Sequence, residues 1–319
     1  MRRDSPSDLP AVAILGAGTM GPGIAAAFAA SGFATSLWAR RLAAAETAVE
    51  DARRRVTMLV DNRLAEPGER HLEPTDDLAA ALDGAELVVE AISEDLDAKR
   101  SLFADVEERA GSGALLASTT SGLDVGEIAR SAHRPERFVV MHFWNPAHLI
   151  PLVEVLGGSD TAPEMVDEAC SLVRRLGKHP VRLNKFVPGF LGVRLQQAVV
   201  RESVALLEAG VASAEDIDAA TRLSFGARFP VIGPLETSDL GGLDVILSIH
   251  EYLLADLDCS QSPQTLLREL VGDGHLGVKT GRGFYDWASR DAAELARRRD
   301  EELIARVKSL RDRGDLARV

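Results

Sequence analysis

The chain has 319 residues, 46% of them hydrophobic and 27% charged, which is typical of a globular protein long enough for two domains. Its net charge of −13 argues against nucleic acid or an anionic membrane surface as the main partner, because both attract basic proteins. The segment Met1–Pro10 is polar and too short for a signal peptide, and no run approaches the ~20 apolar residues of a membrane span, so we expect a cytoplasmic protein.

Short runs rich in valine, leucine and isoleucine alternate with helical patterns from Ala11 to about Leu183. Runs that are apolar on both faces are typical of strands covered on both sides, and alternation with helices indicates parallel crossovers. The sequence therefore predicts a doubly wound α/β sheet. The expected strands are Ala11–Leu15, Thr35–Trp38, Leu87–Ile92, Leu115–Thr119, Phe138–His142, Leu152–Leu156 and Val181–Leu183, and the first expected helices are Pro22–Ser31 and Leu42–Leu64.

Beyond Pro188 the pattern becomes helical, so we expect a Rossmann-type domain over residues 1–187 and an all-helical domain over 188–319. The long helix Phe190–Gly210 and the helices that follow it have more apolar positions than one small helical layer covers, which predicts a homodimer joined through this domain. Cys170 and Cys259 lie far apart and in no metal-ligand spacing, which predicts two reduced thiols and no metal site. The expected helices are Phe190–Gly210, one capped by Ser213, Leu243–Leu257, Gln264–Val271 and the charged Asp291–Leu310.

A glycine-rich segment, Gly16-Ala-Gly18-Thr19-Met20-Gly21, follows the first strand and opens the first helix. Glycines at this spacing permit a tight turn, close approach of a pyrophosphate and close packing of helix on strand. The phosphates would lie at the helix N-terminus, where free N–H groups favour an anion. The segment predicts a dinucleotide site.

The end of the second strand indicates which dinucleotide binds. Sites for NAD usually place a carboxylate there to accept from the ribose hydroxyls, but the sequence reads Ala39-Arg40-Arg41. The two arginines can pair with a 2′-phosphate, so NADP(H) is the expected preference and NAD(H) remains possible. The alternative is that both arginines are simply solvated at a helix start.

Several motifs in order along the chain resemble the 3-hydroxyacyl-CoA dehydrogenase family. They are Met141-His-Phe-Trp-Asn-Pro146, Leu152-Val-Glu-Val155, Pro188-Gly-Phe190 and Lys279-Thr-Gly-Arg-Gly-Phe284. Further segments are closer to its lambda-crystallin or L-gulonate 3-dehydrogenase branch, namely Ile232-Gly-Pro-Leu-Glu-Thr237, Glu208-Ala-Gly-Val-Ala-Ser213 and the charged C-terminal helix. The resemblance covers nearly the whole chain.

The resemblance implies a catalytic set. His142 matches the family's general acid/base, Glu154 the carboxylate that orients it, and Ser121 a serine that bonds the substrate oxygen. A histidine suits proton transfer near neutral pH, and a carboxylate partner fixes its tautomer. Asn145 is expected beside the substrate. His148 lacks such a context, and we interpret it as structural.

Three further residues match cofactor contacts of the family: Glu94 and Lys99 near the nicotinamide ribose, and Lys279. The alternative for Glu94 and Lys99 is a surface pair five residues apart. Both readings stay open at the level of sequence.

Departures from the family pattern affect the substrate more than the chemistry. Val193 stands where the family has an active-site asparagine, Thr119 replaces another asparagine, and the hairpin usual after the second strand is abbreviated over Leu42–Pro74. We expect an oxidoreductase that transfers hydride between nicotinamide and a secondary alcohol or ketone, with a 3-hydroxyacyl or 3-hydroxy acid substrate. The alternatives are a non-CoA substrate (a polyol acid, diketone, carrier-bound acyl group or imine), or a crystallin-like binding protein without turnover.

Overall fold

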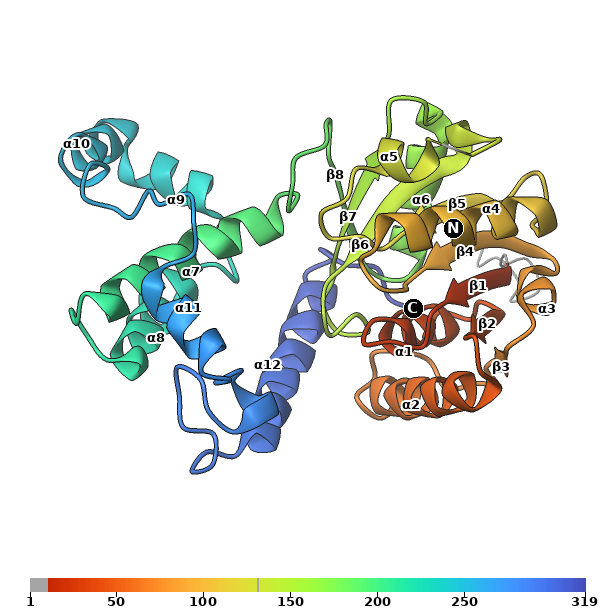
Figure 1. Cartoon of the computed structure of the whole chain (residues 1–319), viewed down its shortest axis with the longest axis horizontal. Coiled ribbons are helices and arrows are strands. Elements are labelled where there is room, and N and C mark those ends of the chain that lie inside the picture. The colour runs from red at the N-terminus through yellow and green to blue at the C-terminus, as the bar shows by residue number, and fades with distance from the viewer. Residues whose placement is uncertain (1–10, 131) are drawn as a thin grey trace. The chain divides into compact units, whose positions relative to one another are not determined.

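A computed structural model describes residues 11–130 and 132–319 (Figure 1). The described chain forms two compact units, one made of the residues up to Leu191 together with Asp300–Val319, the other of Gly192–Arg299. The predicted boundary at 187/188 lies close to the first division. The last twenty residues differ from the prediction, because they pack with the first unit and bury Ile304, Val307 and Leu316 in its core. The expectation about Met1–Pro10 concerns residues outside those described.

The first unit is built on one eight-stranded sheet, in the order β3-β2-β1-β4-β5-β6-β7-β8. All seven predicted strands are present; β1 and β2 have the predicted bounds, and each of the other five has at least one end shifted by one or two residues. The predicted fold class, a doubly wound α/β domain followed by a helical domain, is confirmed. The strands are β1 (Ala11–Leu15), β2 (Thr35–Trp38), β3 (Leu72–Thr75), β4 (Ala85–Glu90), β5 (Leu115–Ser118), β6 (Phe138–Phe143), β7 (Leu152–Gly157) and β8 (His179–Arg182).

Two features of the sheet differ from the sequence prediction. Strand β3 falls in the segment expected to be a polar loop; it holds one buried apolar residue, Leu72, and lies at the sheet edge, where it pairs only with β2. Strand β7 runs antiparallel to β6, whereas we expected parallel crossovers throughout. The connection between them holds no helix, and so short a link suits an antiparallel pair.

Helices cover both faces of this sheet (Figure 1). Residues of β1 alternate between two separate cores, with Val12 and Ile14 facing one and Ala13 and Leu15 the other. The first core includes α1, α2, α6 and the end of α12; the second includes α3, α4 and α5. These helices are α1 (Gly21–Ala30), α2 (Leu42–Asp61), α3 (Leu78–Leu82), α4 (Leu96–Arg109), α5 (Val125–Ala129), α6 (Pro163–Arg175) and α12 (Ala292–Asp312).

The second unit is helical. Its helices are α7 (Gly192–Glu208), α8 (Ala214–Leu223), α9 (Pro234–Gly241), α10 (Leu243–Leu253) and α11 (Thr265–Gly272), followed by the start of α12. The predicted cap of α8 is present, since Ser213 Oγ accepts from Asp216 N at 3.1 Å. Val204 is the one buried hydrophobic residue between 192 and 299. A unit of this size with almost no core of its own requires cover for its apolar side chains.

Within the described residues, no helix is long and apolar enough to cross a membrane. Over the same residues, no cluster of three or more histidine, cysteine and acidic side chains has the geometry of a metal site. Cys170 is buried in α6 and Cys259 is exposed, and both are free thiols.

Candidate active site

The loop after β1 requires glycine at two of the three glycine positions of its motif, Gly16 and Gly21. Gly16 has a φ of +135°, and a Cβ there would stand 2.4 Å from the carbonyl oxygen of Ala91. A Cβ on Gly21 would stand 1.9 Å from the carbonyl oxygen of Gly16. Gly18, by contrast, has no atom within 4 Å of that position, so its backbone faces open space. The loop thus leaves one exposed backbone edge for a ligand to approach.

The N-terminus of α1 has the properties of an anion site. Met20 caps the helix without a side-chain hydrogen bond, and the first turn holds no acidic residue. Thr19 is exposed beside Gly18. The first-turn N–H groups and the helix dipole are therefore available to a negatively charged group. The loop and the helix together fit the pyrophosphate of a dinucleotide.

Arg40 and Arg41 follow β2 and are both exposed. Neither guanidinium makes an ion pair with another residue of the described chain. Ala39, which stands at the end of the strand, is buried and offers no carboxylate. Within the described chain, the end of β2 therefore offers two unpaired guanidinium groups, and Ala39 supplies no carboxylate for the ribose hydroxyls.

His142 and Glu154 face each other across the antiparallel pair of β6 and β7, in direct register. Directly opposed residues on one face of such a pair have adjacent side chains. His142 Nδ1 lies 2.8 Å from Glu154 Oε2, and both side chains are buried. The other ring nitrogen, Nε2, bonds no other residue of the described chain. It is the atom left for proton transfer.

Further contacts fix the Glu154 carboxylate. Leu191 N donates to Oε1 at 2.9 Å, and Trp144 Nε1 donates to Oε2 at 3.3 Å. The ring centroids of Trp144 and Phe190 lie 5.7 and 5.4 Å from that of His142. Sequence reasoning gave neither aromatic residue a role, although Trp144 and Phe190 both lie inside motifs that carry the family resemblance. The imidazole is thus held in one orientation between two rings and a carboxylate.

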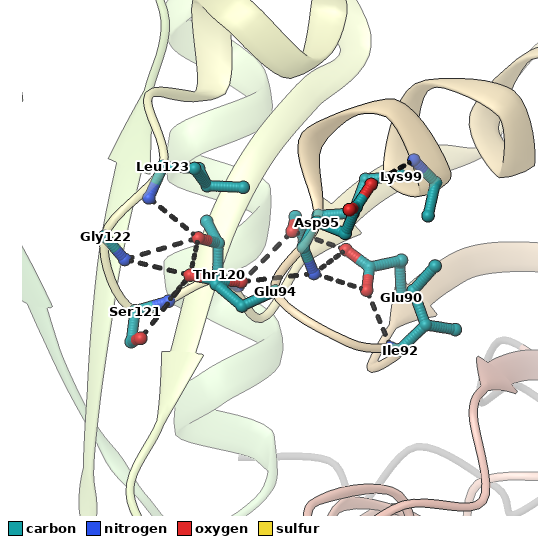
Figure 2. A network of polar contacts seen from close by, with 11 residues as sticks. Glu90, Ile92, Glu94, Asp95, Lys99, Thr120, Ser121, Gly122 and Leu123 are labelled. Atoms are coloured by element: carbon teal, nitrogen blue, oxygen red, sulfur yellow. Dashed lines mark hydrogen bonds and ion pairs between the residues drawn. The ribbon is translucent and has the colours of Figure 1, made fainter.

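Ser121 lies on the exposed loop after β5, where one carboxylate organises the backbone (Figure 2). Glu94 Oε1 accepts from Thr120 Oγ1 at 2.5 Å, from Ser121 N at 3.0 Å and from Gly122 N at 3.2 Å. Burial raises the pKa of Glu94, but the hydrogen bond from Thr120, the charge of Lys99 and the Ser121 N–H outweigh burial and lower it overall. Glu94 is therefore an anion that holds the Ser121 loop.

Lys99 is buried at 1% exposure, so the interpretation of Glu94 and Lys99 as a surface pair is wrong. Its Nζ lies 2.7 Å from Glu90 Oε1 and 3.4 Å from Glu94 Oε2. Glu90, at the end of β4, is fully buried. Sequence reasoning missed it; the signal was a carboxylate closing an otherwise buried apolar run, where an unpaired charge would be costly.

The candidate site residues of the first unit lie together at the carboxyl ends of the parallel strands. Strands β1, β4, β5 and β6 are parallel, and the glycine loop, Glu94, Ser121 and His142 lie at or just beyond their carboxyl ends. In the strand order, β1 and β4 flank the switch point where doubly wound sheets bind ligands.

For the remaining predicted residues we describe position and exposure only. Asn145 is exposed just after β6 and precedes a cis proline bond. Val193 lies in the first turn of α7, and Lys279 is exposed on a short 3-10 helix; both belong to the second unit. Their roles stay predictions. His148 is buried and its Nδ1 lies 3.2 Å from Arg55, consistent with the structural interpretation.

Comparison with family models decides the family. Residues 11–186 match the NAD binding domain of 3-hydroxyacyl-CoA dehydrogenase, and residues 189–287 match its C-terminal domain. The chain belongs to the 3-hydroxyacyl-CoA dehydrogenase family. The resemblance noted in the sequence is thereby confirmed, and with it an NAD-binding oxidoreductase architecture.

Relatives within the family differ in what their names say they act on. A 5-formyl-3-hydroxy-2-methylpyridine 4-carboxylate 5-dehydrogenase of Mesorhizobium japonicum is 34% identical over 92% of this chain and 96% of its own length. A probable 3-hydroxybutyryl-CoA dehydrogenase of Bacillus subtilis is 35% identical over 89% and 99%. The crystal structure of a pyridine-carboxylate dehydrogenase of the first kind, an NAD⁺-dependent dismutase, is 34% identical and superposes with a TM-score of 0.88, covering 93% of this chain and 97% of that one.

Proposed function

We propose that this family member transfers hydride between a nicotinamide and a secondary alcohol or ketone, with His142 as the general acid/base. The observation that carries the proposal is the buried 2.8 Å contact between His142 Nδ1 and Glu154, at the edge of the sheet that also carries the glycine loop. It leaves Nε2 to take or give the substrate proton.

In the oxidative direction, His142 Nε2 accepts the hydroxyl proton as the carbon loses hydride, and Glu154 stabilises the imidazolium that forms. Ser121 Oγ donates to the substrate oxygen. A bound nicotinamide supplies the hydride acceptor or donor. Reduction uses the same groups with the proton moving from His142 to the substrate. The phosphates would bind at Gly16–Gly21, and Glu94, with Lys99 behind it, would face the nicotinamide ribose.

Turnover tests this mechanism and separates it from a crystallin-like binding role. His142→Ala should lose ~10²–10⁴-fold in kcat, because general acid/base catalysis contributes that much. His179→Ala is the matched control, since His179 is exposed at the start of β8. A wild-type protein that binds cofactor but turns over no ketone, or a His142→Ala variant with more than about a tenth of the activity, would overturn the proposal.

We further propose that the cofactor preference is for NADP(H). Arg40 and Arg41 support it, because both are exposed, unpaired within the described chain and followed by no ribose-binding carboxylate. One or two charge-assisted hydrogen bonds of ~1.5–3 kcal/mol predict a preference of about tenfold to a few hundredfold. The related dismutase is NAD⁺-dependent by its name, so the test is sharp: the ratio of kcat/KM for NADPH and NADH in the wild type, in Arg40→Ala/Arg41→Ala and in the control Arg54→Ala. Equal kcat/KM values in the wild type would refute it.

For the substrate we propose a 3-hydroxyacyl or 3-hydroxy acid compound, with a non-CoA substrate as the second candidate. Two observations favour the second: Val193 lacks the amide of the family's asparagine, and the Mesorhizobium relative is named for a pyridine carboxylate. A panel of acetoacetyl-CoA, free acetoacetate, a pyridine carbaldehyde and a cyclic imine with each reduced cofactor separates the candidates. Acetoacetyl-CoA as the best substrate would remove the second one.

We also propose a homodimer joined through the second unit. Large apolar side chains such as Leu223, Leu235 and Leu240 are each about four-fifths exposed, at 77, 81 and 77%, while Val204 alone is buried between 192 and 299. A second copy offers the same unpartnered surface in return. Light scattering at micromolar concentration tests this, and a monomeric mass would contradict it. A cytoplasmic location stays a prediction.

A further inference from the structure

We propose that Glu90 and Lys99 are positioning residues, whose opposite charges fix Glu94 and, through it, the loop that presents Ser121. Neither residue needs to touch substrate or cofactor for this role. The kinetic arm of the test rests on the proposed function, whereas the exchange arm does not.

Glu90, Lys99 and Glu94 form an array of charged side chains, and Glu90 is its buried, fixed end. Its carboxylate accepts from Lys99 Nζ at 2.7 and 2.8 Å, from Ile92 N at 2.8 Å and from Ser118 Oγ at 2.6 Å. These donors come from the end of β5, from the loop after β4 and from α4. Figure 2 shows Ile92 and Lys99 beside Glu90. A fully buried carboxylate with this set of donors holds one rotamer, because any movement would leave buried donors unpaired.

Lys99 links the buried carboxylate of Glu90 to the partly exposed carboxylate of Glu94. It is 1% exposed, and its ammonium group lies between the two carboxylates, 2.7 Å from Glu90 and 3.4 Å from Glu94. The side chain of Glu94 is 42% exposed and could otherwise turn into solvent. Two carboxylates around one ammonium leave a net charge of −1. That charge lies next to the Ser121 loop.

Glu94 transmits the position to the loop backbone. A single oxygen, Oε1, accepts from the N–H groups of two successive residues, Ser121 and Gly122, and from Thr120 Oγ1. Thr120 Oγ1 accepts in turn from Leu123 N at 2.9 Å. Ser121 Oγ itself lies 3.4 Å from Oε1, a long contact that leaves its proton available to a stronger acceptor. Backbone placement of Ser121, rather than capture of its hydroxyl, is what the array achieves.

Hydrogen exchange tests the array without cofactor or substrate. Because removing one charge of a buried pair strands the other, both are replaced together in Glu90→Gln/Lys99→Met. We expect the amides of residues 121–123 to exchange about tenfold faster or more, because their acceptor is no longer held. Glu107→Gln is the matched control: Glu107 is also buried on α4 but accepts from His133 N and Arg134 N. Unchanged exchange at 121–123 in the pair variant, or an equal rise in the control, overturns the proposal.

Kinetics tests whether the pair acts through Glu94. We expect Glu94→Ala and the pair variant each to lower kcat by about ten- to a hundredfold, and their combination to lower it by no more than about twofold further, since residues of one network are not additive. Additive losses would mean that the pair acts elsewhere and would overturn the proposal. Absence of turnover in the wild type would refute the proposed function, and the exchange result would still decide the positioning role.

A second variant covers failure of the first to fold. Glu90→Gln/Lys99→Gln keeps two side-chain amides that can bond each other, leaves no buried charge unpaired and removes the charge that holds Glu94. It should raise exchange at residues 121–123 in the same way and leave residues bonded by Glu107 unchanged. If Glu90→Gln/Lys99→Gln leaves the 121–123 amides as protected as in the wild type, the positioning role is refuted.

Discussion

Replacing Glu154 by glutamine tests how much of the proposed catalysis depends on a negative charge behind the histidine. The carboxylate accepts from His142 Nδ1, Trp144 Nε1 and Leu191 N, among its contacts. An amide of the same shape has one oxygen and one nitrogen. If its nitrogen faces Leu191, that N–H loses its acceptor; if it faces His142, the imidazole must adopt the other tautomer, with its proton on the wrong nitrogen.

The size of the effect follows from these contacts. A hydrogen bond to a charged group contributes about 1.5–3 kcal/mol, and more of it is realised when His142 becomes an imidazolium in the transition state. A loss of that size lowers kcat by about ten- to a hundredfold, since 1.4 kcal/mol corresponds to a factor of ten. The loss should be smaller than that of His142→Ala, because Glu154 orients the proton-transfer group and does not replace it.

The assay is steady-state kcat in both directions, with cofactor affinity measured separately by fluorescence titration. Glu168→Gln, an exposed position on α6, is the control for a charge change without a role in the site. A Glu154→Gln variant that keeps its fold and more than half of its kcat would refute the claim that the carboxylate supports the imidazolium.

Three further predictions concern other parts of the chain. Burial, and then the charge of Arg311, lower the pKa of Lys178 from 10.5 to about 7; the unfolded chain then binds more protons between these values, so the free energy of unfolding rises with pH across that window. Lys178→Met should abolish this rise. Below pH 7 it should increase the free energy of unfolding, measured by urea denaturation, by up to about 5 kcal/mol, and an unchanged pH dependence would contradict the prediction. Val193→Asn should raise kcat/KM for acetoacetyl-CoA about five- to a hundredfold and lower it for a non-CoA substrate; a fall for both would refute altered specificity. Gly21→Ala should weaken cofactor binding at least about tenfold in titration, because the new Cβ would lie 1.9 Å from Gly16 O; Gly113→Ala, with open space around it, should bind normally.

The sheet could be predicted from sequence wherever strands are buried on both faces. Leu115–Ser118, for example, is buried throughout, and its first three residues continue the apolar run that begins at Ala114. Strand β3 escaped because an edge strand needs few apolar residues, and Leu72-Glu-Pro-Thr75 has only one. The antiparallel direction of β7 was not predicted, because an apolar run indicates that a strand is buried but not in which direction it runs. The short link after β6 was the signal for an antiparallel pair.

The site was predicted unevenly for a similar reason. His142 and Glu154 were found through a motif, and the register of β6 and β7 gives their proximity a physical cause. Glu90 was not found, because a carboxylate at the end of a strand has no signature until its partners from α4 and β5 are known. The contributions of Val193 and Lys279 depend on a second unit with little core of its own, which no local pattern describes.

The antiparallel pairing of β6 and β7 has a consequence for how such enzymes diversify. His142 and Glu154 are 12 positions apart, on strands joined by a short link, so their contact forms within one local hairpin. Residues 192–299 can therefore accumulate insertions and substitutions without disturbing the distance between the two groups. A lineage with this layout can exchange one substrate for another while keeping the proposed proton-transfer pair, and relatives about one-third identical to this chain bear names that refer to different substrates.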